Sequence, residues 1–397
     1  MHFEIRRGIK SVAGPIPTGE PIDRRSVNAV AMMGGDYPNV VFDLRVKEGD
    51  MVRTGQTLCV DRHHPDVCFV ANASGRVSKI RLGPRRRLEF LEIVITGDDV
   101  ITFETDDLRK LLLQSGAWTS FRTRPFGVIP EPASFPAAIF VTATEATPQA
   151  PNPREVIAAD TANFQRCAEA LLQLTTGPVF VCQRQGTPLV AQGDRLRVAT
   201  FSGPYPSGCA GPQIHRLMPV SRQRMVWEIG YQDVIAIGHL LATGRIMTSR
   251  VVSVSGPNQA ETVTTLLGAK LSDVVGSYMT VPNDQYLGRK TLQVTAQGTQ
   301  ANTARPFWHK ILDALPAAPI GAMLPMEALE RAFPFDIPPA PLMRALAIGD
   351  VETAERLGCL ELLEEDLTLL SDLCTSGSDY GQLLRHTLIL LSNERVG

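Results

Sequence analysis

Aromatic and cationic side chains alternate in the segment "GAWTSFRTRPFG" at 116–127. Trp118, Phe121 and Phe126 offer flat apolar surfaces, and Arg122 and Arg124 place fixed cations beside them. Such rings can stack on an aromatic head group while the guanidinium groups donate hydrogen bonds to its oxygens. The alternative is a packed connector whose arginines satisfy backbone carbonyls, and the sequence leaves both interpretations open.

A second group of this kind, Tyr231, Gln232 and Asp233, follows a predicted strand at 225–230 and opens a predicted helix that runs to Gly244. Open α/β sheets bind ligands in crevices where the strand order reverses. We therefore predict that this turn joins the segment 118–126 in one ligand-contacting surface. The alternative role for Asp233 is to cap the helix.

The glycine-rich segment "SGPYPSGCAGPQIH" at 202–215 is the nearest approach to a phosphate-binding loop. The chain contains neither GxGxxG nor GxxxxGK[ST], and the prolines in this segment remove backbone N–H groups that an anion would need. We favour a rigid structural loop. His215 closes that loop, and because no nucleophile pairs with it in the sequence, a hydrogen-bonded role is favoured over a catalytic one.

Two half-motifs, "VKEGDMVRTGQTL" at 46–58 and "ANASGRV" at 71–77, are typical of the barrel-sandwich domain of biotinyl and lipoyl carriers. Such carriers hold their cofactor on a lysine at the hairpin between the two halves. The segment 59–70 has His64 and Pro65 at that turn and contains no lysine. The domain is therefore predicted to lack a swinging arm and to serve as a structural or docking module.

The cysteines, the net charge and the lack of long apolar segments exclude several classes of protein. The seven cysteines are scattered without a CxxC pair, which argues against a disulfide framework, structural zinc and the common iron–sulfur sites. A formal net charge of −2 gives no general attraction to nucleic acid. No secretory signal or membrane span is evident. The run 85–87 of three arginines is expected in a solvated turn, with an anionic partner or lipid headgroup as the alternative.

The order of short apolar runs, helical patterns and turns in the 397 residues predicts a multi-domain protein of α/β and β class. Residues 1–108 read as the barrel-sandwich β-domain with an N-terminal arm. Residues 109–252 read as a Rossmann-like open α/β domain with a parallel sheet, a helix at 155–174 and a last strand at 250–256. Residues 253–305 read as a small α+β module with a helix within 261–275, and residues 306–397 as a helical domain whose last helix begins at a capping box of Asp379 and Gln382.

Several strings closely resemble the A subunit of the sodium-translocating NADH:quinone reductases (Na+-NQR), and the resemblance runs almost from end to end. They are "VKEGD", "AWTSFRTRPFG", "AIFVTATEATPQAPNP", "VWEIGYQDVIAIGHLLATG", "YLGR", "LMRALAIGD" and "DYGQLLR". The chain is also similar to the large soluble subunit of Rnf complexes and to the NADH-binding subunit of complex I. Three departures, namely Gln213 in place of a histidine, a shorter segment 276–285 and Leu370 in place of a cysteine, indicate a divergent or paralogous member.

The resemblance implies a peripheral subunit on the cytoplasmic face of the bacterial inner membrane, held there by the other subunits of a six-subunit complex. Such a subunit carries no flavin or iron–sulfur cluster and is associated with ubiquinone. The resemblance also implies a β-grasp-like fold of the soluble-ligand-binding type for 253–305. The expected alternative is a docking module of a related, Rnf-like complex without quinone contact. The residues expected to contact quinone are Trp118, Phe121, Arg122, Arg124, His215, Tyr231, Gln232 and Asp233.

Overall fold

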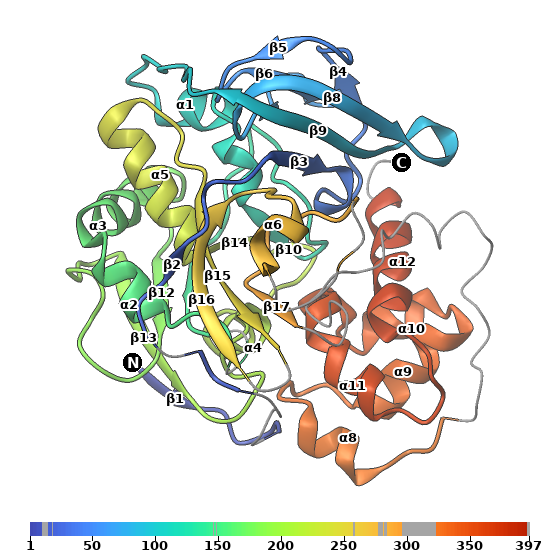
Figure 1. Cartoon of the computed structure of the whole chain (residues 1–397). Coiled ribbons are helices and arrows are strands. Elements are labelled where there is room, and N and C mark those ends of the chain that lie inside the picture. The colour runs from blue at the N-terminus through green and yellow to red at the C-terminus, as the bar shows by residue number, and fades with distance from the viewer. Residues whose placement is uncertain are drawn as a thin grey trace.

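The computed structural model describes residues 1–9, 15–17, 19–145, 147, 149–256, 259–276, 281, 284–295 and 323–394. Four sheets and a group of C-terminal helices make up this part of the chain (Figure 1). The barrel-sandwich sheets lie at the top of that view, the parallel sheet with its helices at the left, and the C-terminal helices at the lower right. The predicted class, with barrel-sandwich, α/β and helical parts, is confirmed.

The N-terminal domain consists of two small sheets packed on one apolar core. Tyr37, Phe42 and Phe69 meet edge to face in that core, with ring centroids 4.8 to 6.2 Å apart. The ribbon of two long strands that closes the domain extends beyond it on the right of Figure 1. One sheet has the order β3 (Ala29–Met33), β9 (Leu88–Gly97), β8 (Ser74–Leu82) and β5 (Met51–Val52), and the other β4 (Phe42–Leu44), β6 (Thr57–Asp61) and β7 (Cys68–Val70).

The central domain is a doubly wound α/β sheet. Its order is β1 (His2–Glu4), β13 (Leu196–Ser202), β12 (Val179–Gln183), β11 (Ile139–Ala143), β14 (Val226–Gly230) and β10 (Arg122–Arg124), and only β10 runs antiparallel to its neighbour. The chain order reverses between β11 and β14, as expected of a Rossmann-like domain.

Both faces of this sheet are covered, which explains why its strands read as continuous apolar runs. Ile139 and Val141 pack on one side with helices α2 (Pro153–Ala158), α3 (Thr161–Ala170) and α5 (Tyr231–Thr243). Phe140 packs on the other side with α4 (Ala210–Leu217). Helix α1 (Leu108–Gln114) leads into the domain and is followed by Gly116 in the left-handed conformation, which favours glycine at the end of a helix.

The third part contains the main differences from the predicted elements. Strand β15 (Ser249–Ser255) was expected to extend the parallel sheet, but it pairs with β16 (Ala260–Leu266) antiparallel and with β17 (Gln293–Thr295) in a separate sheet that also includes β2 (Ile22–Asp23). The helix expected within 261–275 is reduced to α6 (Leu271–Val275), because Thr262 and Thr264 alternate with Val263 as half-buried strands require. The rest of the predicted module, 296–305, lies outside the described residues.

The C-terminal part is helical, as predicted, although residues 306–322 lie outside the described residues. The carboxylate of Asp379 accepts a hydrogen bond from the backbone N–H of Gln382 at 3.1 Å, so the predicted N-cap is confirmed. The Gln382 side-chain amide donates to the same carboxylate at 2.6 Å, whereas in a capping box that side chain would accept from the Asp379 N–H. Short 3-10 turns at Cys359–Glu361 and Glu364–Leu367 face the α/β domain. The helices are α8 (Glu327–Ala332), α9 (Pro339–Ile348), α10 (Val351–Arg356), α11 (Thr368–Leu373) and α12 (Tyr380–Asn393).

Candidate functional site

The predicted aromatic surface is part of the protein interior. Trp118, Phe121 and Trp227 pack against one another with ring centroids 5.2 to 5.6 Å apart, and each is fully buried. The Trp118 Nε1–H donates to the carbonyl of Pro130 at 2.8 Å. The flat faces expected to stack on a ligand are therefore occupied by one another, which supports the packed-connector alternative for these rings.

Strand β10 carries both predicted arginines, and it joins three parts of the molecule. On one side, the Arg122 Nη2–H donates to the backbone carbonyl of Asp36, which belongs to the N-terminal domain. The backbone N–H of Arg289, from the third part of the chain, donates to the Asp36 carboxylate at 2.9 Å. Arg289 Nη2 also donates to Ser120 Oγ at 2.6 Å. We call this group, with Tyr37, Asp233 and Arg250, the Arg122 junction.

The Arg122 junction has more positive than negative groups. Asp233 accepts hydrogen bonds from Arg250 Nη2 at 2.5 Å and from Arg289 Nη2 at 3.2 Å. Within the described part of the chain, Arg122 faces the carboxylate of Asp36, Arg250 that of Asp233, and Arg289 both. Burial lowers the pKa of Arg122 and raises the pKa of Asp36, although the charges of the two side chains act in the opposite direction. Arg122 Nη1 and Arg289 Nε have no hydrogen-bond partner among the residues that the structure describes.

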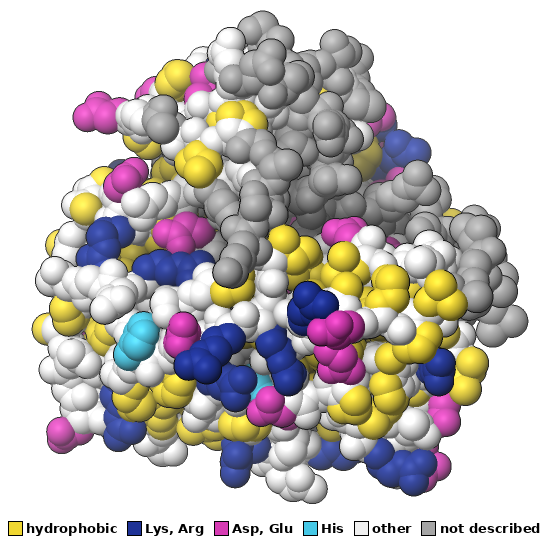
Figure 2. All heavy atoms as spheres, turned by 90° about the horizontal axis from the view of Figure 1, so that it is seen from below, with side chains coloured by type: hydrophobic (Ala, Val, Ile, Leu, Met, Phe, Trp, Pro, Cys, Tyr) yellow, Lys and Arg dark blue, Asp and Glu magenta, His cyan; other side chains and the backbone are white. Residues whose placement is uncertain are grey.

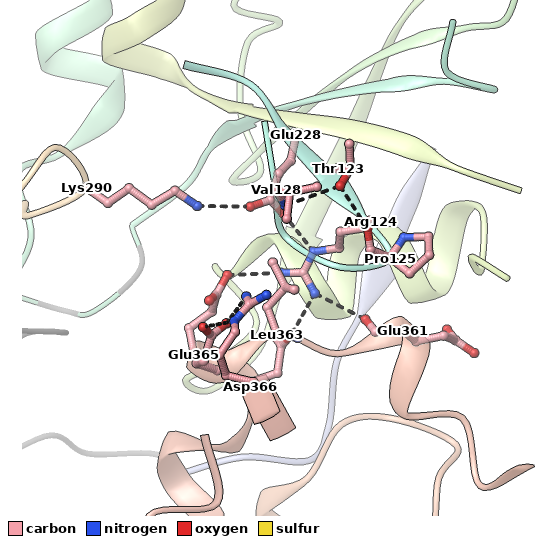
Figure 3. Close-up of polar contacts among 12 residues, drawn as sticks. Thr123, Arg124, Pro125, Val128, Glu228, Lys290, Glu361, Leu363, Glu365 and Asp366 are labelled. Carbon is pink, nitrogen blue, oxygen red and sulfur yellow. Dashed lines mark hydrogen bonds and ion pairs between the residues drawn. The ribbon is translucent and has the colours of Figure 1, made fainter. Parts of the chain in front are cut away.

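Arg124 lies two residues further along and is surrounded by carboxylates (Figure 3). Its Nε donates to Glu228 at 2.7 Å, its Nη1 to Asp366 at 2.6 Å and its Nη2 to Glu365 at 3.1 Å. Nη1 also reaches the carbonyl of Glu361 at 3.1 Å. Every nitrogen of this fully buried guanidinium group is therefore bonded, and the bonds join β10 and β14 to the C-terminal helical domain. We call this group, with Lys290, the Arg124 clamp.

The charges of the Arg124 clamp shift the protonation of its members. Burial opposes ionisation of Glu228, but the charges of Arg124 and Lys290 outweigh it and lower the pKa of Glu228 to about 2. Lys290 Nζ lies 3.3 Å from the Glu228 carboxylate. For Glu365 and Asp366 burial dominates and raises the pKa. Two cations thus face three carboxylates. The Arg124 clamp therefore has more negative than positive side chains, whereas the Arg122 junction has more positive than negative ones.

The turn after β14, residues 231–233, lies beside the Arg122 junction. Gln232 donates to the Val251 carbonyl at 2.7 Å and accepts from its N–H at 2.8 Å, which fixes the start of α5 to β15. Tyr231 is buried, and its hydroxyl lies 3.3 Å from the Gln232 amide. Gly230 occupies the N-cap position and the Asp233 carboxylate bonds to arginines, so the alternative role of Asp233 as a cap is wrong.

His215 does not close a loop, because residues 210–217 form α4 and place it in the last turn of that helix. Its Nδ1 lies 2.6 Å from the Glu361 carboxylate, and its Nε2 accepts from the Asp336 N–H at 3.2 Å. The expected hydrogen-bonded role is thus confirmed, on a helix. Since Glu361 also bonds to Arg124 through its carbonyl, His215 supports the contact with the helical domain and is separate from the Arg122 junction.

The structure thus divides the eight predicted residues into groups. Arg122 and Asp233 share the Arg122 junction, and Arg124 and His215 face the helical domain. Gln232 bonds to the backbone of β15, and the rings of Trp118, Phe121 and Tyr231 lie in the core. The prediction of quinone contact itself stays a prediction. Sequence reasoning missed the residues that surround the arginines, which are Asp36, Glu228, Arg250, Arg289, Lys290, Glu365 and Asp366. Two of them lie in strings that carry the family resemblance, namely Glu228 in "VWEIGYQDVIAIGHLLATG" and Arg289 in "YLGR".

The glycine-rich segment owes its glycines to close packing. A Cβ atom on Gly208 would lie 1.8 Å from the carbonyl oxygen of Glu145, and one on Gly211 would lie 2.0 Å from a carboxylate oxygen of Asp366. A cavity of about 570 Å³ opens beside it, where β11, β12 and β13 end. Its principal cation, Arg184, is already bonded to Glu145 at 2.9 Å and Ser207 at 2.8 Å. These contacts support the interpretation of a rigid structural loop.

Two features of the described part of the chain bear on cofactors and membranes. Within that part, no three His, Cys, Asp or Glu side chains are grouped so that they could hold a metal ion. No described helix is both long and apolar enough to cross a membrane. His63 is exposed and His64 half-buried in the hairpin between β6 and β7.

Comparison with known proteins agrees with this architecture. Residues 3–98 match the model of the NqrA N-terminal barrel-sandwich hybrid domain, and residues 103–246 match that of the NqrA second alpha/beta domain. The chain is 36% identical to the A subunit of the Na(+)-translocating NADH-quinone reductase of Cellvibrio japonicus, over 99% of this chain and 100% of the relative. The corresponding proteins of Yersinia pseudotuberculosis and Neisseria meningitidis are 35% and 33% identical with the same coverage. The chain therefore belongs to the NqrA family, the A subunits of the Na+-translocating NADH-quinone reductases.

Proposed function

We propose that this protein is a peripheral, cofactor-free subunit of a Na+-translocating NADH:ubiquinone reductase complex. In that role it supports electron transfer from NADH to quinone, coupled to Na+ export, while the redox centres and the ion path lie in the other subunits. The observation that carries the proposal is the likeness to NqrA proteins over 99% of the chain. The complex would hold it at the cytoplasmic face of the membrane through its partner subunits.

The absence of a resident redox group is part of the proposal. It is supported by the segment 59–70, which offers no lysine for a lipoyl or biotinyl arm, and by the lack of CxxC and glycine-rich nucleotide motifs. We expect the purified chain to be colourless and to leave NADH unoxidised. A flavin spectrum, NADH turnover by the isolated chain, or a mass increment within 59–70 in protein from the native host would contradict this part of the proposal.

Quinone contact is assigned to the Arg122 side of β10 rather than to the Arg124 side. A quinone has two carbonyl oxygens that accept hydrogen bonds, and a buried donor without a partner is costly. Arg122 Nη1 is such a donor in the described structure, whereas all the nitrogens of Arg124 are bonded. The excess of positive groups at the Arg122 junction also favours an electron-rich oxygen there. Entry of a ligand would require the packed junction to open.

The test is the quinone content of the purified complex after the substitution Arg122→Met. We expect loss of bound quinone or a raised KM for quinone. Arg250→Met is the matched control, because Arg250 is a buried arginine of the same junction whose Nη1 and Nη2 are both bonded. If quinone content and KM are unchanged by Arg122→Met in an assembled complex, or fall equally in the control, Arg122 is not the contact.

A second candidate is a docking module of a related, Rnf-like or paralogous complex without quinone contact. One observation favours it: Trp118, Phe121 and Tyr231 are buried among other side chains and present no free ring face. Unchanged quinone behaviour in the Arg122→Met complex, together with loss of assembly when the chain is deleted, would select this candidate.

A further inference from the structure

The ribbon formed by β8 and β9 ends in a strongly cationic tip. Arg85, Arg86 and Arg87 follow one another there, and all three side chains are exposed. No carboxylate among the described residues pairs with them. The whole chain carries a net charge of −2, so this group is not a by-product of a basic composition. On the face seen in Figure 2, by contrast, Lys and Arg side chains lie beside Asp and Glu side chains.

The part of the stem next to the tip differs from the tip, because both of its cations, Lys79 and Arg81, are paired. Arg81 Nε lies 2.8 Å from the Glu89 carboxylate, and Lys79 Nζ lies 3.2 Å from that of Asp284. The strand after the tip is anchored by Leu88 and Phe90, which are each 3% exposed. The ribbon therefore holds three guanidinium groups, unpaired among the described residues, next to a stretch whose own cations are paired and whose following strand is packed.

The backbone of the tip has an unusual conformation that fixes it. Arg85 has φ 54° and Arg86 φ 58°, in the left-handed region that arginine seldom adopts. The Gly83 N–H donates to the Arg87 carbonyl at 2.8 Å and the Arg86 N–H to the Gly83 carbonyl at 3.1 Å. The tip is thus a closed turn, and its guanidinium groups are carried on an ordered backbone.

We propose that this tip, residues 83–87, is a docking contact for a carboxylate-bearing surface of a partner protein. Guanidinium groups bind carboxylates through two parallel hydrogen bonds, and this pairing requires a defined geometry. The fixed backbone of the turn helps to provide that geometry. Leu82, which is 40% exposed, adds apolar area beside the charges. Attraction of three arginines to lipid headgroups needs no ordered turn and fades within a Debye length of about 8 Å at physiological salt. The inference rests on the proposed place in a multi-subunit complex but not on quinone contact.

Zero-length cross-linking tests the contact directly. Carbodiimide joins a lysine amine to a carboxylate within ion-pair distance, so the complex is prepared with Arg86→Lys, which keeps the charge. We expect a cross-linked peptide that joins position 86 to an Asp or Glu of a neighbouring protein in the complex. Arg53→Lys is the control, because Arg53 is exposed in the same domain. Absence of a cross-link at position 86, or equal cross-linking at position 53, would overturn the proposal.

Charge reversal measures the strength of the contact. The chain with Arg85→Glu, Arg86→Glu and Arg87→Glu is added back to membranes that contain the remaining subunits, and a chain with Arg53→Glu, Arg62→Glu and Arg76→Glu is the control. We expect at least about tenfold weaker, salt-sensitive binding for the tip variant only. Equal binding of both variants would contradict the proposal.

Protein-free vesicles of phosphatidylcholine mixed with phosphatidylglycerol separate the two kinds of partner. If the unaltered chain binds these vesicles and the tip substitutions abolish that binding, the tip contacts lipid and the proposal is overturned. The result is distinct from failure of the proposed quinone role, because quinone content is measured in Arg122→Met complexes with an intact tip.

Discussion

Arg122 and Arg124 are two residues apart on one short strand, and both are buried, yet their surroundings are opposite. Arg124 faces three carboxylates and uses every nitrogen, whereas Arg122 shares the Asp36 carboxylate with Arg289 and keeps its Nη1 without a described partner. The difference indicates that the strand performs two tasks. At Arg124 it fixes the helical domain, and at Arg122 it retains a donor that the fold itself does not use.

The strongest test of this comparison is Arg124→Met. The change leaves Glu228, Glu365 and Asp366 without their shared cation, and breaking a buried ion pair typically costs about 3–5 kcal/mol of the free energy of unfolding. We expect a loss of that order in urea or thermal unfolding, with the helical domain released first. A loss below about 1 kcal/mol would show that the clamp is not what holds this domain.

The pH dependence of stability should separate the clamp from the rest of the chain. The pKa of Glu228 is about 2 in the folded protein against 4.5 ordinarily, so its ionisation stabilises the fold above about pH 4.5. That stabilisation is lost as the pH falls from 4.5 towards 2. Between about pH 6 and pH 3 we expect the unaltered protein to lose about 2 kcal/mol more than Glu228→Gln does.

Glu365 and Asp366 should affect the pH dependence of stability in the direction opposite to Glu228. Burial raises their pKa, so any stability from their protonation is present at low pH and is lost as the pH rises. Both residues are present in each protein compared, and their contribution therefore largely cancels. Parallel unfolding curves of the unaltered protein and the Glu228→Gln variant across this range would contradict the assignment.

Arg122→Met should cost less than Arg124→Met. Arg122 makes one described hydrogen bond from its guanidinium group, to a carbonyl, and its removal relieves the excess positive charge of the junction. We expect a loss of about 1 kcal/mol in urea unfolding, since a net hydrogen bond is worth about that much. A loss as large as that of Arg124→Met would remove the distinction between the two ends of the strand.

The smallest effect is expected from Arg356→Ala on the surface of α10. Its ion pair with Glu352 is 3.8 Å long, and both side chains are more than two-thirds exposed, at 68% and 83%. Exposed pairs of this kind contribute about 0.5 kcal/mol or less. A larger change in the unfolding midpoint would show that the helical domain depends on its surface charges as well as on the clamp.

Local patterns were sufficient to predict the elements of the α/β domain but not its edges. Apolar runs buried on both faces marked β11 and β12, and Gly244 marked the end of α5. Strand β15 has a similar apolar pattern, yet it pairs with β16 in another sheet. The pattern of 261–275 predicts a helix, so the sequence offers β15 no partner outside the parallel sheet. The pairing of a strand depends on residues remote in sequence, and no local period reports it.

The candidate site was predictable only in part for the same reason. The alternation of Arg122 and Arg124 in "RTR" drew attention to the right strand. Their partners lie up to 242 residues away, in segments where an acidic run such as 364–366 reads as a wet helix face. A sequence shows that a charge is present, but it does not show whether the fold will bury that charge beside another.

The pairing of β1 with β13 determines an order of events during synthesis. His2 meets Thr200 across the sheet, a separation of 198 residues, while β3 and β9 of the next domain pair within 29–97. At about 5–20 residues per second, a ribosome needs on the order of 10 seconds or more to supply the partner strand. The first strand made can therefore be placed in its sheet only after the whole N-terminal domain and about half of the chain have been synthesised.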